Sequence, residues 1–131
     1  MTKRKVAILI PVRNDKFLIL KRADWTTAPG LWNFPGGEVD KYEYPFQAAA
    51  RELEEEANLW ANENKLDYFG QIEQSDKILY FYGTKKSEGE AKINNESSDM
   101  AWITIEELDN YDFIPLGKWL VSTLKEYIAK G

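Results

Sequence analysis

The 131-residue sequence contains no cysteine and no histidine. Without cysteine there is no disulfide, no thiolate nucleophile and no zinc–thiolate site. Without histidine, a general base has to be a carboxylate, a lysine or a tyrosine, and a metal site has to be built from oxygen ligands. Oxygen ligands favour Mg²⁺, Mn²⁺ or Ca²⁺. Because the absence of cysteine suits a reducing compartment, we expect the protein to be cytoplasmic.

The sequence also lacks a long apolar segment and an excess of positive charge. The apolar run near the N-terminus spans only residues 6–12, so it predicts a buried strand rather than a membrane span or a signal peptide. The formal net charge of −5 disfavours binding to long nucleic acids and to anionic membranes. A small phosphate-bearing molecule remains compatible with this charge, because a bound divalent cation would reverse the local field.

Apolar residues make up 44% of the chain and aromatic residues 14%, which is typical of a packed globular protein. The length predicts one domain over residues 1–131. Turn residues and apolar periodicity predict strands at 6–12, 17–22, 31–37, 68–73, 78–84 and 101–103, helices at 45–57 and 115–129, and a polar loop at 85–99. This order predicts an α+β domain in which a mixed β-sheet is sandwiched between helices, an α/β/α arrangement.

The helix predicted at residues 45–57 combines an apolar stripe with a group of carboxylates. At about 100° per residue, Glu52, Glu55 and Glu56 share an arc of about 100°. Asn58 follows the helix and can take the left-handed conformation that ends it. The apolar stripe, roughly 130° from the carboxylates, is expected at Phe46, Ala50, Leu53 and Ala57.

Carboxylates crowded in this way repel each other by roughly 0.2–0.5 kcal/mol per pair in an isolated helix. A divalent cation would make use of the crowding, because Mg²⁺ binds carboxylate and phosphate oxygens together. Arg51 can pair with Glu43 or Glu55 and limit the repulsion. Gly36 and Gly37 leave backbone carbonyl and N–H groups free for a metal or a phosphate. The alternative is an ordinary solvated, Glu-rich helix in a structural protein.

The spacing of these residues resembles a known motif. From Gly37 the sequence has five residues, Glu43, seven residues, Arg51-Glu52-Leu53, one residue, Glu55-Glu56, one residue and Asn58-Leu59. This resembles the Nudix box of the Nudix hydrolase (MutT-like) family, G-x5-E-x7-R-E-U-x-E-E-x-G-U, in which U is a bulky aliphatic residue. Asn58 stands where the box has glycine. Asparagine also tolerates a positive φ, so the departure affects the helix end rather than the chemistry.

The resemblance implies the Nudix fold and Mg²⁺-dependent hydrolysis of a nucleoside diphosphate linked to another moiety, with Mn²⁺ as a substitute. It implies that Glu55 and Glu56 are metal ligands together with the Gly36 carbonyl, and that Glu52 is either a ligand or the base that activates water. It also implies that Arg51 and Glu43 brace the loop and the helix. For a further acidic ligand, the resemblance favours Glu96, with Asp99 as the rival.

Candidates for substrate binding lie outside the box. Lys21 and Arg22 end a strand and can hold phosphate, or they are ordinary strand-end charges. Asn33 can bind a base edge with its amide, or it is a polar strand position facing solvent. Aromatic side chains that can stack on a base, or belong to the core, are Trp25, Trp32, Phe34, Tyr80, Tyr82 and Phe113; Phe34 and Phe113 are the two we select.

The short chain and the segment LWNFPGG are similar to MutT-type members, which cleave nucleoside triphosphates to the monophosphate and pyrophosphate. Alternative substrates implied by the resemblance are ADP-ribose, nucleotide-sugars and dinucleoside polyphosphates. The segment YDFIPLGKW has no obvious counterpart of the family's purine-binding asparagine, which argues against specificity for oxidised guanine. A non-enzyme alternative is a nucleotide-binding sensor. The sequence leaves the oligomeric state open between monomer and homodimer.

Overall fold

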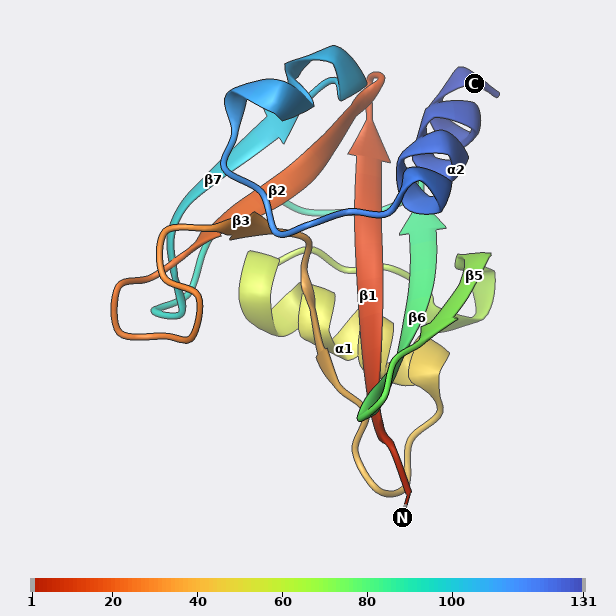
Figure 1. Ribbon diagram of the computed structural model, residues 1–131. Helices are drawn as coiled ribbons and strands as arrows, with labels where there is room; N and C mark the ends of the chain where they lie inside the picture. The colour runs from red at the N-terminus through yellow and green to blue at the C-terminus, as the bar shows by residue number, and fades with distance from the viewer. Residues whose placement is uncertain (1, 131) are drawn as a thin grey trace.

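The computed structural model describes residues 2–130, which form a sheet with helices on both faces (Figure 1). The strands are β1 (Arg4–Arg13), β2 (Lys16–Arg22), β3 (Trp32–Asn33), β4 (Gly36–Glu38), β5 (Asp67–Glu73), β6 (Lys77–Thr84) and β7 (Ser97–Ile103). The helices are α1 (Pro45–Ala57) and α2 (Lys118–Ala129), with short 3₁₀ turns at η1 (Glu63–Lys65) and η2 (Ile105–Asn110). No helix in this part of the chain has both the length and the apolar character needed to cross a bilayer.

Strand β1 lies at the centre of the sheet, whose order is β3-β2-β1-β6-β5. It runs parallel to β6 and antiparallel to β2 and β4, so the sheet is mixed, as predicted. Only the last residues of β1 pair with β2, whereas its first half pairs with β4. The strands β2, β3 and β7 therefore diverge from β1 and form a second branch of the sheet (Figure 1).

Strands β1 and β2, which correspond to the predicted strands at 6–12 and 17–22, form a hairpin. Asn14 and Asp15 have φ values of 51° and 64°, which are the two positive values that a tight two-residue hairpin turn requires. Asparagine and aspartate tolerate this conformation better than other non-glycine residues.

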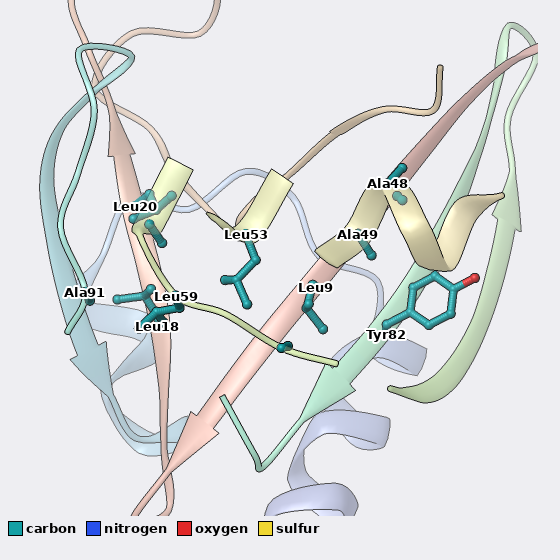
Figure 2. Close-up of a cluster of buried hydrophobic side chains, with 12 residues drawn as sticks. Leu9, Leu18, Leu20, Ala48, Ala49, Leu53, Leu59, Tyr82 and Ala91 are labelled. Carbon is teal, nitrogen blue, oxygen red and sulfur yellow. The ribbon is translucent and has the colours of Figure 1, made fainter. Parts of the chain in front are cut away.

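Alternate residues of β1 face opposite helices, because side chains alternate across a strand. Ala7 and Leu9 pack under α1 in a first cluster with Leu53, and Figure 2 shows this cluster between the helix and the sheet. Ile10 belongs to a second cluster on the other face, which is covered by Leu124 of α2. The α/β/α layering predicted from the sequence is confirmed.

Three predicted elements have different boundaries in the structure. The segment 31–37 is two strands: β3 pairs with β2 and β4 pairs with β1, and Pro35 lies where the chain crosses between the branches. The last helix begins at Lys118 rather than at 115, because residues 114–117 are not helical and Gly117, the residue before the helix, is extended. Strand β7 begins at Ser97, inside the predicted loop, because its first residues pair with the end of β2.

The predicted apolar stripe of α1 is confirmed at Leu53 and Ala57 and wrong at Phe46 and Ala50. Ala48, Ala49, Leu53 and Ala57 are the buried residues of the helix, whereas Phe46 and Ala50 are only partly buried. The small alanines let the helix lie close to the sheet. As a result the buried stripe and the carboxylate face overlap, and Glu52 and Glu56 point toward the sheet rather than away from it.

Candidate active site

Two glycines of β4 bring the backbone next to the carboxylates of α1. The Gly36 N–H donates a hydrogen bond to Glu56 Oε1 at 2.7 Å. At Gly37, a Cβ atom would lie 2.5 Å from the Glu52 carboxylate, closer than any side chain allows. Glycine at both positions therefore permits the close approach of helix and strand that buries these carboxylates.

The Arg51 guanidinium holds the other side of the cluster. It donates two hydrogen bonds of 2.9 Å to the two carboxylate oxygens of Glu43, a bidentate pair. It also donates to Glu52 at 2.9 Å, to Glu55 at 3.1 Å and to the Glu38 carbonyl at 3.0 Å. These bonds lower the pKa of Glu43 and raise that of Arg51. Arg51 thus connects the loop before α1 to the helix itself.

The loop that precedes β7 is fastened to the end of α1. The Asn94 side chain donates to the Glu55 carbonyl at 3.0 Å and accepts from the Glu96 N–H at 2.9 Å. Two residues before Asn94, the Lys92 N–H donates to the Ala57 carbonyl at 2.9 Å. These bonds bring Glu96 to the carboxylate cluster. The Asp99 carboxylate instead accepts from the Met100 N–H.

Burial shifts the acid strength of two of the carboxyl groups. It raises the pKa of Glu56 to about 8, with the charges of Glu52 and Glu96 adding to the rise and the Gly36 N–H opposing it. Burial also raises the pKa of Glu52, against the attraction of Arg51. Glu55 differs from both because 55% of its side chain is exposed. The cluster thus contains two buried carboxyls whose pKa values are raised and one carboxylate that is solvated.

The donor set fits a hard divalent cation, because every available ligand is a carboxylate or carbonyl oxygen. Within residues 2–130, no three carboxylates yet lie close enough together to hold a metal ion. The Arg51 guanidinium donates hydrogen bonds to the Glu52 and Glu55 carboxylates, and the Gly36 N–H donates to the Glu56 carboxylate. A cation that binds here would therefore compete with Arg51 and with the Gly36 N–H for these carboxylates.

A pocket of about 520 Å³ opens on the α2 side of the sheet and reaches Gly36. Its floor consists of apolar residues of β1 and β6, and residues 114–117 form one wall. Three of the predicted substrate-binding residues, Arg22, Asn33 and Phe34, line it. Arg22 is held by the carbonyl and the hydroxyl of Thr27, and its charge opposes the rise in the Glu56 pKa. The pocket and the carboxylate cluster therefore meet at Gly36.

The other predicted substrate-binding residues lie elsewhere. Lys21 is opposite Asp99 in the β2–β7 pairing and does not line the pocket. Phe113 lies behind the pocket wall, with its ring centroid 5.0 Å from that of Phe34. The remaining aromatic candidates are also outside: Tyr80 and Tyr82 pack on the α1 side, Trp32 is in the core, and Trp25 is exposed.

Sequence reasoning missed several residues at the site. Asn94 acts through a side-chain hydrogen bond to a segment far away in the chain, the end of α1, for which the sequence carries no local signal. Thr27 lies only five residues from Arg22, and its hydroxyl accepts from that guanidinium. Lys77 and Gln74 line the pocket from the β5–β6 hairpin. The predicted strand alternation places Lys77 on the same face as Leu79 and Phe81, and this signal could have identified it.

Known proteins resemble this chain over almost its whole length. The family model described as NUDIX domain matches residues 2–123. The chain belongs to the Nudix family. This assignment implies the fold. A solved structure of MutT, from work on the Aliivibrio salmonicida and Vibrio cholerae proteins, has the same fold. That structure aligns over 96% of this chain and 99% of its own, with a TM-score of 0.83 and 24% identity.

Two curated relatives carry names that state an activity. The 8-oxo-dGTP diphosphatase of Escherichia coli K12 is 29% identical over 128 residues, which cover 95% of this chain and 98% of that protein. The CTP pyrophosphohydrolase of the same strain is 29% identical over 112 residues, covering 85% and 83%. This Nudix chain is accordingly an enzyme, a pyrophosphohydrolase that acts on phosphoanhydride bonds.

Proposed function

We propose that this enzyme is a MutT-type pyrophosphohydrolase that cleaves nucleoside triphosphates to the monophosphate and pyrophosphate, with Mg²⁺ or Mn²⁺. The observation that carries the proposal is the meeting of the pocket and the carboxylate cluster at Gly36. A nucleoside in the pocket would extend its phosphates toward these carboxylates. Two relatives support a triphosphate substrate, since their names specify 8-oxo-dGTP and CTP.

Glu55, Glu56 and the Gly36 carbonyl would hold the cation, with Glu96 as a further ligand. Glu96 is favoured over Asp99 because its charge acts on both Glu52 and Glu56. A divalent cation held there neutralises the charge of the phosphates and makes them open to attack by water.

Glu52 serves as the base that takes a proton from the attacking water, because burial raises its pKa toward the working range of a base. It would do so from a fixed position, since Arg51 donates to its carboxylate and Gly37 leaves it room. Arg51 and Glu43 act as positioning residues. Arg22, which lines the pocket and whose charge acts on Glu56, would hold a phosphate oxygen.

A nucleotide panel tests the proposal. Purified protein is incubated with each nucleoside triphosphate, ADP-ribose, nucleotide-sugars and dinucleoside polyphosphates, with Mg²⁺, with Mn²⁺ and with EDTA. We expect pyrophosphate release from triphosphates, and none with EDTA. Faster cleavage of ADP-ribose or a dinucleoside polyphosphate would instead favour the alternative substrates. Tight nucleotide binding without turnover of any compound would contradict the proposal and favour a sensor.

A further inference from the structure

We propose that Lys77 determines base specificity, and that its ammonium group selects bases with a keto oxygen over bases with an amino group at the same position. The inference rests on the proposed function, because it concerns the nucleoside end of the same pocket. Inosine-, guanine- and uracil-type nucleotides form the favoured class. Adenine-type nucleotides form the disfavoured class.

Lys77 is a half-buried cation that faces the pocket without a carboxylate partner. It shares the pocket-facing side of β6 with Leu79 and Phe81, which are apolar. Among residues 2–130, no carboxylate lies within salt-bridge distance of its ammonium group, and the group donates no hydrogen bond to the protein. The ammonium group can therefore donate its hydrogen bonds to a group that enters the pocket.

The acidic residues nearest to Lys77 are bound to other cations. Glu73 pairs with Lys3 at 2.7 Å, and Asp76 with Arg4 at 3.7 Å. Glu38, on the neighbouring strand β4, also pairs with Arg4, at 2.9 Å. The charge of Lys77 is therefore left for a group that enters the pocket.

The position of Lys77 along the sheet places it at the base rather than at the phosphates. Lys77 pairs with Arg4 on β1, whereas Gly36 pairs with Ile8, four residues further along the same strand. Four strand residues span about 13 Å. A substrate with its phosphates near Gly36 and Glu56 would thus bring the far edge of its base within reach of the long Lys77 side chain.

The hairpin that carries Lys77 is held firmly. The Gln74 N–H donates to the Lys77 carbonyl at 2.8 Å and closes the turn. Lys3 donates to the Gln74 carbonyl at 2.8 Å, and the Arg4 N–H donates to the Asp76 carbonyl at 3.1 Å. These bonds fix the backbone at Lys77, so its side chain extends into the pocket from a constant point.

The chemistry of an ammonium group gives the direction of the preference. Lysine only donates hydrogen bonds. Inosine and guanine present a keto oxygen at position 6, and uracil presents one at position 4. Adenine and cytosine present an amino group at those positions, which also donates. Gln74 and Asn33 carry amides that can donate or accept, so they do not impose this direction.

A matched pair of substrates, ITP and ATP, tests the inference because they differ only at position 6 and its neighbouring proton. We expect the protein to cleave ITP with a kcat/KM at least about tenfold higher than ATP, the factor that a hydrogen bond to a charged group supplies. Lys77→Met keeps the aliphatic stem and should bring the ratio close to one. Lys77→Arg keeps a donor and should retain the preference, and the control Lys125→Met, on the exposed face of α2, should leave the ratio unchanged.

The outcomes separate this inference from the proposed function. If wild-type protein cleaves no triphosphate, the proposed function fails. If it cleaves triphosphates but prefers ATP, or if Lys77→Met slows ITP and ATP equally, the inference is overturned and the function stands. An equal loss would indicate that Lys77 binds phosphate. Circular dichroism and melting temperature of each variant show whether the fold is retained.

Discussion

At the scale of single residues, the absence of a side chain at Gly37 matters as much as the carboxylate that it faces. We predict that Gly37→Ala lowers kcat at least about tenfold, because its methyl group would push the Glu52 carboxylate out of position. The melting temperature should change little, since a flexible side-chain end can move aside. Full activity of Gly37→Ala would contradict the role of Glu52.

Glu56 can be tested by a substitution that preserves shape. Glu56→Gln should lower kcat by roughly 100-fold or more, because an amide is a poor cation ligand. The fold should persist, since a glutamine oxygen can still accept from the Gly36 N–H. Glu54→Gln, on the exposed face of the same helix, is the matched control and should retain full activity. Comparable rates for the two variants would refute the ligand assignment.

The residues of the Nudix box were predictable from the sequence because their chemistry and spacing are encoded locally. The support of Glu56 by Gly36 and the fastening of Glu96 through Asn94 were not, because each depends on segments far apart in the chain. The roles of the individual carboxylates stay predictions until variants are measured.

At the scale of elements, α1 ends as its sequence predicts. Asn58 has a φ of 59°, and its side chain donates to the Glu90 carbonyl at 3.2 Å. We predict that Asn58→Ala lowers the free energy of unfolding by about 1 kcal/mol, because alanine is strained in the left-handed conformation. Asn58→Gly, which restores the residue of the box, should cost less than Asn58→Ala. Urea denaturation measures both, and equal losses would show that the Glu90 contact rather than φ matters.

For two elements, the pattern of apolar residues in the sequence predicts a detail that differs from the structure. The helix at residues 45–57 was predicted correctly in extent, but only two of the four residues predicted for its buried face, Leu53 and Ala57, are buried. Alanines at 48 and 49 form that face because a helix packed closely on a sheet needs small side chains. The segment 31–37 looked like one strand because its apolar pattern is continuous. Only the branching of the sheet separates β3 from β4.

At the scale of the whole molecule, β1 contributes to both hydrophobic clusters and couples them. Leu53 and Leu124 are each 2% exposed or less, on opposite faces of the sheet. Replacing either one with alanine should cost about 2–5 kcal/mol. Because both clusters share β1, each variant should still unfold in a single transition at a lower temperature. Two separate calorimetric transitions would contradict the prediction of one domain. The oligomeric state and the cytoplasmic location stay predictions.

The position of Gly36 has one further consequence. Its strand lies at an open edge of the sheet, with the pocket on one face and the buried carboxylates of α1 on the other. A ligand that occupies both regions has to curve around that edge. Stiff, straight compounds would therefore fill one compartment only, and inhibitors of this enzyme should gain most from a hinge between their aromatic and anionic halves.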